Sequence, residues 1–232
     1  PTAASYLTLL SGGEIQDVGR PYPLILAHPL EGSPASLGNI QDWQAEWKWD
    51  GIRAQAIRRS GQFMIWSRGE ELVTDRFPEL NCFVEALPDG TVLDGEILAW
   101  QGDAPLPFAT LQTRIGRKKL TPKVIAASPV AFMAYDILEH QGQDIRGLPL
   151  SERHTILEQI IATAAECKEL HLSPVVAAES WGALEKTWQS SRERSVEGLM
   201  LKRRDSAYGV GRPRGSWWKW KISPHSVDAV LI

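Results

Sequence analysis

The sequence has little cysteine and no long hydrophobic run. Cys82 and Cys167 are the two cysteines of the chain. They are too few for a disulfide framework and are not spaced like metal ligands, which favours a reducing compartment. No apolar stretch approaches the ~18–20 residues that span a bilayer, and the first residues lack the basic-then-apolar pattern of a secretory signal. We therefore expect a cytoplasmic protein that does not contact membranes.

Charge is unevenly distributed along the chain. The 232 residues carry a formal net charge of −3. Residues 1–110 have a net charge of −8 and residues 111–232 a net charge of +5, with basic clusters at 114–123 and 202–214. Such clusters are typical of proteins that bind polyanions. A solvated charged surface is the alternative interpretation.

The hydrophobic pattern predicts a mixture of strands and helices. Thr74, Ser151 and Ser180 are each placed to cap a helix whose apolar residues recur on one face. Strands are predicted where apolar and polar residues alternate, or where an apolar run is bounded by turn residues. These stretches are 46–58, 62–68, 92–100, 130–138, 199–203 and 217–222. Hairpins and helices without a strict strand–helix–strand repeat indicate an α+β fold dominated by antiparallel sheets.

The most informative local segment is Glu46-Trp47-Lys48-Trp49-Asp50-Gly51-Ile52-Arg53. In an extended chain Glu46, Lys48 and Asp50 point to one side, and the two tryptophans point to the other. Tryptophans packed into the core would hold the lysine in position, and Gly51 permits a turn directly after it. A lone lysine is most often a solvated surface charge, so this segment needs support from the rest of the chain.

Four later segments place charged or aromatic residues within apolar strands. Alternation puts Phe132 and Asp136 on the same strand face. Glu197 and Lys202 are five residues apart and face opposite sides, unless Gly198 interrupts the strand. Taken singly, each segment is also explained by a half-buried strand with a polar outer face. The four segments are Asp94-Gly95-Glu96, Phe132-Met133-Ala134-Tyr135-Asp136, Glu197-Gly198-Leu199-Met200-Leu201-Lys202 and Trp217-Trp218-Lys219-Trp220-Lys221.

Together and in this order, these five segments resemble the nucleotidyltransferase motifs of covalent nucleotide ligases and capping enzymes. The first resembles Lys-x-Asp-Gly-x-Arg, and Ser67-Arg68-Gly69 resembles the short basic motif that follows it. Three further segments are similar to ATP-dependent DNA ligases in particular: Arg76-Phe77-Pro78-Glu79-Leu80, Tyr135-Asp136 and Pro149-Leu150-Ser151-Glu152-Arg153. Over residues 21–232 the chain thus resembles the adenylation domain of an ATP-dependent DNA ligase of bacterial type.

The resemblance implies a fold and a division of the chain. The fold is a nucleotidyltransferase, or ATP-grasp-like, adenylation domain in which antiparallel-dominated sheets and flanking helices form a nucleotide cleft. Residues 1–20 are expected to be the tail of an upstream region and residues 21–224 the adenylation domain. Residues 225–232 resemble a linker and the first strand of an oligonucleotide-binding (OB-fold) domain, which is then missing or truncated.

The same resemblance implies a role for each motif residue. Lys48 would attack the α-phosphate of ATP, release pyrophosphate and hold AMP as a phosphoramidate, with neighbouring cations favouring the unprotonated amine. The expected catalytic residues are Lys48, Asp50, Lys202 and Lys219. The expected nucleotide contacts are Glu46 on adenine, Phe132 stacked on adenine, Glu96 on the ribose, Arg53 and Arg68 on sugar or phosphate, and Lys202, Lys219 and Lys221 on phosphates. Mg²⁺ would be associated with Glu197 and Glu96.

The expected partners follow from the same chemistry. AMP would pass to the 5′-phosphate of nicked double-stranded DNA, and the adjacent 3′-hydroxyl would displace it and seal the strand. The basic clusters at 114–123 and 202–214 would bind the DNA backbone without sequence preference. We expect a monomer located in a bacterial cytoplasm and associated with the nucleoid through DNA.

Two alternative functions remain open at this stage. One is another covalent nucleotidyltransferase, either an RNA ligase or an mRNA-capping enzyme, which shares the lysine motif but not the ligase-like segments at 76–80 and 149–153. The other is a non-catalytic nucleic-acid-binding module, which would keep the basic clusters but has no need for Lys48, Glu96 and Glu197 in a pocket. Use of NAD is disfavoured because no dedicated nicotinamide-binding domain precedes Lys48.

Overall fold

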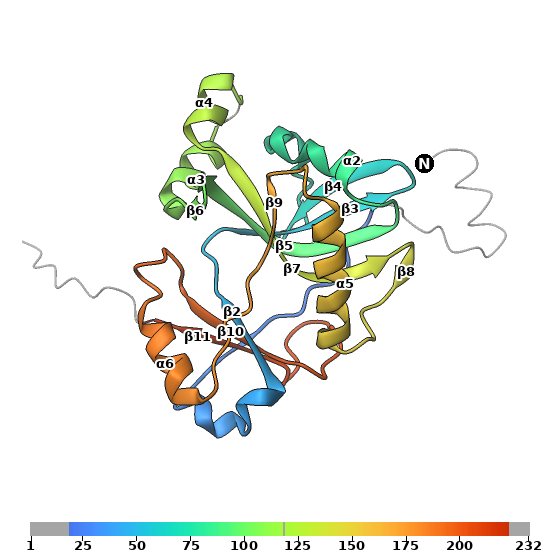
Figure 1. The fold of residues 1–232 in the computed structure, drawn as a ribbon. Helices are drawn as coiled ribbons and strands as arrows, with labels where there is room; N and C mark the ends of the chain where they lie inside the picture. Colours follow the sequence, from blue (N-terminus) through green and yellow to red (C-terminus); the bar gives the residue numbers. More distant parts are fainter. Residues whose placement is uncertain (1–18, 118, 223–232) are drawn as a thin grey trace, which may run out of the picture.

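The computed structural model describes residues 19–117 and 119–222, which form two β-sheets with helices around them (Figure 1). The predicted α+β fold with mainly antiparallel strands is confirmed. The predicted linker and first OB-fold strand at 225–232, and most of the predicted tail at 1–20, lie outside the described residues. No helix within the described ranges is long and apolar enough to cross a membrane.

The smaller sheet has four strands in the order β1-β11-β10-β2. It consists of β1 (His28–Pro29), β11 (Trp217–Lys221), β10 (Gly198–Arg203) and β2 (Trp43–Trp47). Strand β10 pairs antiparallel with both β11 and β2, and β1 pairs parallel with β11. Three of the predicted motif segments, distant in the sequence, therefore lie side by side.

The larger sheet has seven strands. Its main path is β4 (Gln62–Ser67), β3 (Ile52–Arg59), β5 (Thr91–Gln101), β7 (Val130–His140) and β8 (Gln143–Asp144). The short β6 (Ala104–Pro105) pairs with β5, and β9 (Leu170–Leu172) pairs parallel with β7. The other two motif strands, β5 and β7, are neighbours in this sheet.

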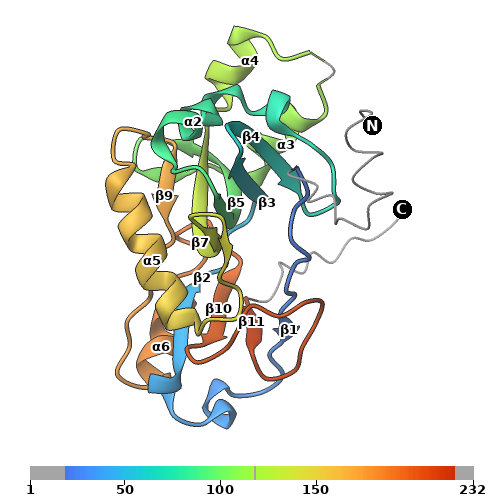
Figure 2. The ribbon, with the colours of Figure 1, turned by 90° about the vertical axis from the view of Figure 1, so that its right-hand side faces the viewer.

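Helices cover the outer surfaces of the two sheets. The longest, α5 (Leu150–Thr163), packs against β7 and reaches the β10–β11 loop, where Leu150 and Ser151 donate backbone hydrogen bonds to the carbonyls of Ser206 and Arg204 (Figure 2). The remaining α-helices are α2 (Phe83–Ala86), α3 (Phe108–Ile115), α4 (Pro122–Ala127) and α6 (Trp181–Gln189). Short 3-10 turns are η1 (Pro34–Leu37), η2 (Ile40–Asp42), η3 (Thr74–Arg76) and η4 (Pro78–Cys82).

The predicted helix starts are confirmed at one of three positions. Ser180 caps α6, because its Oγ accepts a hydrogen bond from the Ala183 amide. Thr74 starts only a 3-10 turn, and its Oγ1 accepts from the Ile65 amide of the neighbouring strand instead. Pro149 precedes α5 without a side-chain cap, so Ser151 lies inside the helix.

A cluster of buried hydrophobic residues joins the two sheets. Ile57, Val92 and Leu138 come from the seven-stranded sheet and pack with Trp217 and Tyr208 from the other side. All five side chains are buried. Because burial of apolar area is the main source of cohesion between layers, this cluster fixes the two sheets relative to one another.

The predicted strand stretch at 46–58 is divided into two strands, with the break at the turn expected at Gly51. The chain leaves the four-stranded sheet at Trp47 and enters the seven-stranded sheet at Ile52. Gly51 sits in the crossing, where an added Cβ would lie 2.4 Å from the carbonyl oxygen of Ile97 and 2.8 Å from Glu96 Cγ. Close packing against β5 therefore requires glycine here, and it places Lys48 between the two sheets.

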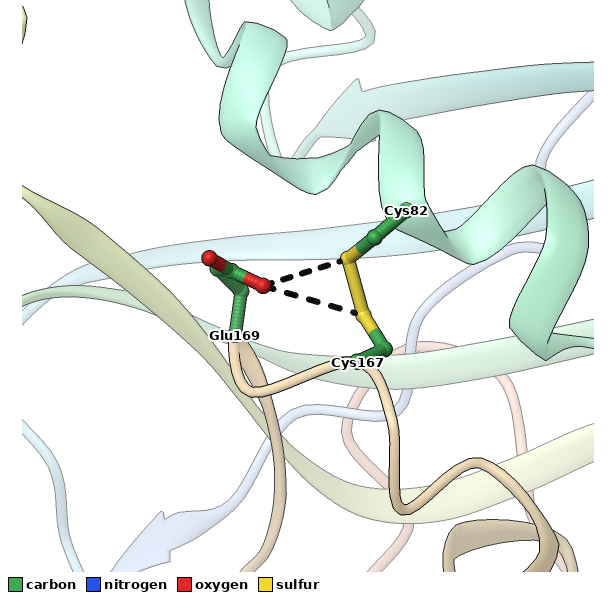
Figure 3. Close-up of a disulfide and its surroundings, with 3 residues drawn as sticks. All are labelled: Cys82, Cys167 and Glu169. Atoms are coloured by element: carbon green, nitrogen blue, oxygen red, sulfur yellow. Dashed lines mark hydrogen bonds between the residues drawn. A yellow bond between two sulfur atoms is a disulfide. The ribbon is translucent and has the colours of Figure 1, made fainter.

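The two cysteines are bonded to each other. Cys82 ends η4 and Cys167 lies between α5 and β9, and the bond closes a sequence separation of 85 residues. Glu169 faces the bonded sulfurs, with a carboxylate oxygen 3.4 Å from Cys82 Sγ and 4.0 Å from Cys167 Sγ (Figure 3). The sequence did not predict this pairing, because cysteines 85 residues apart give no sign that β9 joins β7 beside η4.

Candidate active site

A cleft of about 220 Å³ opens between the two sheets. Eight of the predicted site residues line it: Glu46, Lys48, Arg53, Arg68, Glu96, Lys202, Lys219 and Lys221. Residues that we did not predict also line it, namely Leu26, Ala27, Trp47, Trp49, Tyr135, Met200, Arg212 and Trp217. The lining is rich in cations and aromatic rings, which suits a ligand that carries both phosphate and a flat base.

Lys48 is held by its backbone at the junction of the two sheets. Its amide donates to the carbonyl of Gly198, and its carbonyl accepts from the amide of Glu197, both at 2.8 Å. The Lys48 ammonium forms an ion pair with the Glu197 carboxylate. We expected cations to dominate around this amine, but its hydrogen-bond partner is a carboxylate.

Glu197 bridges two lysines. Its second carboxylate oxygen accepts from Lys221 at 3.1 Å, and these opposite charges keep the pKa of Glu197 below its usual value against the opposing effect of burial. Gly198 starts β10 with φ of 131°, and an added Cβ there would lie 2.1 Å from the Trp220 carbonyl. Of the two arrangements that the sequence left open, the structure has the one in which β10 begins at Gly198 and Glu197 lies outside the strand.

Asp50 lies at the edge of this group, exposed and outside the cleft lining. Partial burial and the nearby Glu197 raise its pKa, while Lys48 and Lys221 oppose the rise. Electrostatic coupling to Lys48 is the feature that connects Asp50 with the predicted catalytic role.

Lys202 is fully buried and its charge is compensated. Its Nζ donates to Glu46 at 2.9 Å and to the Tyr135 carbonyl at 3.2 Å. It also lies 4.6 Å from the centre of the Tyr135 ring and 4.5 Å from that of Trp217. Charge, hydrogen bonds and two ring faces therefore fix this cation in the floor of the cleft.

Glu96 has the most perturbed carboxyl group of the cleft. Burial raises its pKa to about 8, while Arg53 and Lys48 oppose the rise. A carboxyl with such a pKa is present in both protonation states near neutral pH and can accept or donate a hydrogen bond.

Lys219 faces cations rather than acids. Burial first, and then the charges of Lys221, Arg212 and Lys48, lower its pKa. Within the described part of the chain, Lys219, Arg212 and Arg68 have no carboxylate partner. Three uncompensated cations at one cleft form a site for a polyanion.

Phe132 does not belong to the cleft, which corrects our prediction. Its side chain is fully buried in the core of the seven-stranded sheet, edge-on to Phe83 at 5.6 Å. Its ring occupies the space left by Gly95, where an added Cβ would lie 2.4 Å from Phe132 Cε1. A nucleotide in the cleft cannot reach this ring.

Tyr135 supplies the aromatic ring of β7 in the cleft. Ala134 pairs with Gly95 and Asp136 with Asp94, so Tyr135 is an extra residue without a partner in the register. A bulge of this kind turns a side chain toward a new direction and is common beside active sites. Tyr135 is three residues after Phe132, so alternation places it on the opposite face of β7, and this could have indicated Tyr135 as the cleft residue. The bulge itself has no signal in the sequence.

The two basic clusters are only partly available for DNA. Arg114 is buried and pairs with Glu79, and Lys202 is buried beside Glu46. Arg203 pairs with Asp205. Within the described ranges, the exposed basic side chains of the two clusters that have no ion-pair or hydrogen-bond partner are Arg117, Lys119, Lys123, Arg212 and Arg214.

The carboxylates of the cleft fit a Mg²⁺ ion that is also bound by substrate phosphates. Among the described residues, Glu96 and Glu197 are not part of any group of three acidic or thiol ligands that lie within bonding range of one ion. Mg²⁺ usually takes one or two carboxylates and completes its shell with water and substrate phosphates. The donors present therefore fit an ion that arrives with a triphosphate, not an ion held by the protein alone.

Comparison with known proteins gives the family. The sequence model described as "ATP dependent DNA ligase domain" matches residues 24–221, most of the chain. The chain belongs to the ATP-dependent DNA ligase domain family. Because this ligase domain contains Lys48 and its cleft, the resemblance found in the motifs is confirmed, and the two alternative functions are disfavoured.

Curated relatives and solved structures agree with this family. The ligase domain is 34% identical to the "Probable DNA ligase" of Koribacter versatilis, over 91% of the chain and 40% of that protein. It is 33% identical to the "Probable DNA ligase" of Streptomyces coelicolor, over 93% of the chain and 42% of that protein. The structure described as "mycobacterial DNA ligase D complexed with ATP and MES" superposes with a TM-score of 0.67 at 30% identity, covering 86% of this chain and 60% of that one. The chain thus spans about two fifths of the length of these two curated relatives.

Proposed function

We propose that this ligase domain transfers AMP from ATP to the Nζ of Lys48. Nζ would form a bond to the α-phosphorus, the bond from that phosphorus to the bridging oxygen would break, and pyrophosphate would leave. The supporting observation is the cleft itself, which brings the Lys48 amine together with three uncompensated cations and an aromatic ring. The Glu197 carboxylate already accepts a hydrogen bond from this amine and is therefore placed to take its proton.

The lining suggests how ATP lies in the cleft. The exposed cations Arg68 and Arg212, together with Lys219, would bind the phosphates and stabilise the charge that develops during transfer. The Tyr135 ring would stack on the base, an interaction worth ~1–3 kcal/mol. Lys202 lies over the Tyr135 ring and donates a hydrogen bond to Glu46. Glu46 would therefore contact the edge of the adenine or keep Lys202 oriented toward the α-phosphate.

Mg²⁺ would enter with the triphosphate. When bound, it would supply charge neutralisation at the phosphates. Glu197 and Glu96 are the cleft carboxylates available to it, while Lys48 and Lys221 would have to share or leave Glu197. Asp50 would add negative charge at the rim of the same group.

We further propose that the AMP is passed to the 5′-phosphate at a nick in double-stranded DNA and that the 3′-hydroxyl then seals the strand. The uncompensated surface cations Arg117, Lys119 and Lys123 near α3 and α4, and Arg212 and Arg214 beside the cleft, would contact the DNA backbone. These contacts predict affinity that falls with salt and depends little on sequence. A monomer acting on DNA in a bacterial cytoplasm fits this proposal.

The experiment that tests the proposed function is labelling with three nucleotides in parallel. The purified chain is incubated with Mg²⁺ and α-labelled ATP, α-labelled GTP or adenylate-labelled NAD, and protein-bound label is measured after denaturation. Label from ATP alone, released on adding pyrophosphate, is the expected result. Label from GTP alone would identify a capping-type enzyme, and no label from any of the three would refute the proposal. Nick sealing is then measured separately with adenylated protein and a 5′-labelled nicked duplex.

A further inference from the structure

Tyr208 connects the loop between the catalytic strands to the opposite sheet. It lies between β10, which carries Lys202, and β11, which carries Lys219. Its side chain is buried, and its amide donates to the carbonyl of Arg146 at 2.8 Å. The loop is therefore anchored by Tyr208 rather than free to move with the solvent-exposed residues around it.

The hydroxyl of Tyr208 binds a buried carboxylate of the seven-stranded sheet. It donates to Asp94 Oδ2 at 2.6 Å, and Asp94 is fully buried. Burial and the adjacent Asp94 raise the pKa of Tyr208 well above its usual value, so the phenol remains a donor at any working pH. A hydrogen bond to a charged group in a buried site is among the stronger ones in a protein.

Asp94 in turn holds the cleft residue Arg53. Arg53 Nε and NH2 donate to the two oxygens of Asp94 at 3.1 and 2.7 Å, and NH2 also reaches the Tyr208 oxygen at 3.2 Å. NH1 donates to the carbonyl of Ile25 at 2.7 Å. A guanidinium has five N–H donors, so at most one is left for a ligand. Arg53 thus acts in the cleft mainly as a fixed charge whose position is set by Asp94 and Tyr208.

The ring of Tyr208 supports the second cation of the cleft floor. It packs edge-on against Trp217 with the ring centres 5.8 Å apart, and Lys202 lies over the face of the same Trp217. One buried side chain therefore supports Arg53 through its hydroxyl and, by way of the Trp217 ring, Lys202, while it does not line the cleft.

We propose that Tyr208 is a positioning residue for adenylate transfer, one that aligns the Arg53 and Lys202 charges for the transition state. This proposal rests on the proposed function at Lys48. Because Tyr208 does not line the cleft, its loss removes alignment and leaves ATP binding almost unchanged. An interaction made only in the transition state appears in the rate constant and not in KM.

The test compares Tyr208→Phe with a matched control, Tyr22→Phe. Tyr22 also donates to a buried carboxylate that holds an arginine, since its hydroxyl lies 2.7 Å from Glu139 and Glu139 pairs with Arg59. Tyr22 does not line the cleft. Both variants remove one hydroxyl from one tyrosine–carboxylate–arginine group, so both should lose thermal stability. Single-turnover formation of lysyl-AMP is measured over a range of ATP concentrations, at a temperature where melting curves show each variant folded.

Tyr208→Phe should lower the maximal rate by about ten- to a hundredfold, the effect expected for a lost charge-assisted hydrogen bond and a small misplacement of catalytic groups. The half-saturating ATP concentration should stay within about threefold, and Tyr22→Phe should keep its rate within about twofold of the parent. Equal rates in the two variants, or a change confined to ATP affinity, would overturn the proposal. So would a Tyr208→Phe protein that does not fold while Tyr22→Phe does. If the parent chain itself takes no label from ATP, the proposed function has failed instead.

Discussion

Replacing Arg114 with glutamine tests whether this residue builds the fold or binds DNA. Sequence position placed it in a basic cluster, but all five of its N–H donors are used inside the protein. Nε and NH2 donate to the Arg76 carbonyl, NH1 and NH2 to the Glu79 carboxylate, and NH1 also to the Ser128 carbonyl. The guanidinium lies 5.1 Å from the centre of the Phe77 ring. No donor remains for a phosphate.

The structure sets the expected magnitude of this change. Breaking a buried ion pair by removing one partner costs about 3–5 kcal/mol. Arg114 is 1% exposed but Glu79 keeps 18% of its side-chain surface, so water can partly solvate the abandoned carboxylate. We therefore expect a loss near the lower end, about 3 kcal/mol of unfolding free energy, which is roughly 1–3 M in the urea midpoint.

The assay pairs Arg114→Gln with Arg117→Gln, its exposed neighbour just beyond the end of α3. Urea unfolding should show the loss for Arg114→Gln and almost none for Arg117→Gln. Binding to a nicked duplex is measured at several salt concentrations. Arg117→Gln should reduce the slope of log affinity against log salt by up to about 0.9, the value for one phosphate contact, while folded Arg114→Gln keeps the parental slope. A normal urea midpoint with a reduced salt slope in Arg114→Gln would refute this assignment.

Three further changes have defined outcomes. Tyr135→Ala should weaken ATP binding by roughly 5- to 150-fold through lost stacking, whereas Phe132→Leu should lower stability without changing ATP affinity; isothermal titration with ATP distinguishes the two, and the reverse pattern would restore the original assignment. Glu96 has a pKa of about 8 in the folded chain and 4.5 as its reference value, so the folded state binds the extra proton and stability falls as pH rises through this interval; Glu96→Gln should flatten this fall in urea midpoints measured from pH 5 to 9, and an unchanged slope would contradict it. Replacing Cys82 and Cys167 by serine should cost about 4.6 kcal/mol under oxidising conditions, from closure of a loop of 85 residues, and most of this loss should disappear in the presence of a reductant. A difference in urea midpoint between parent and variant that is the same with and without reductant would show that the bridge does not form in solution.

Much of the fold was predictable because it depends on local patterns. Apolar alternation marked the central strands of both sheets, and Ser180 marked a helix start through its own side-chain bond to the Ala183 amide. Gly51 marked the turn within the predicted stretch 46–58, but not that its two halves belong to different sheets. That separation depends on the close contact of Gly51 with β5, which is a long-range contact and has no local sequence signal.

The cleft was predictable to the extent that motif residues lie on strands that become neighbours. Phe132 failed for a different reason, since strand parity gives two possible faces and the sequence does not say which one is the cleft. The bulge at Tyr135 and the space at Gly95 decide this, and both depend on the pairing of β5 with β7. The predicted DNA-binding role of Arg114 failed because a cluster of charges in the sequence does not report burial, and the partner Glu79 is distant in sequence.

The most direct measurement is peptide mass spectrometry of the chain after incubation with ATP and Mg²⁺. We expect one AMP per chain, attached through nitrogen to the side chain of Lys48, labile to acid and stable to base. Lys48→Ala should carry no adduct, while its affinity for nicked DNA stays close to that of the parent. An adduct on another residue, or one that persists in Lys48→Ala, would show that Lys48 is not the nucleophile.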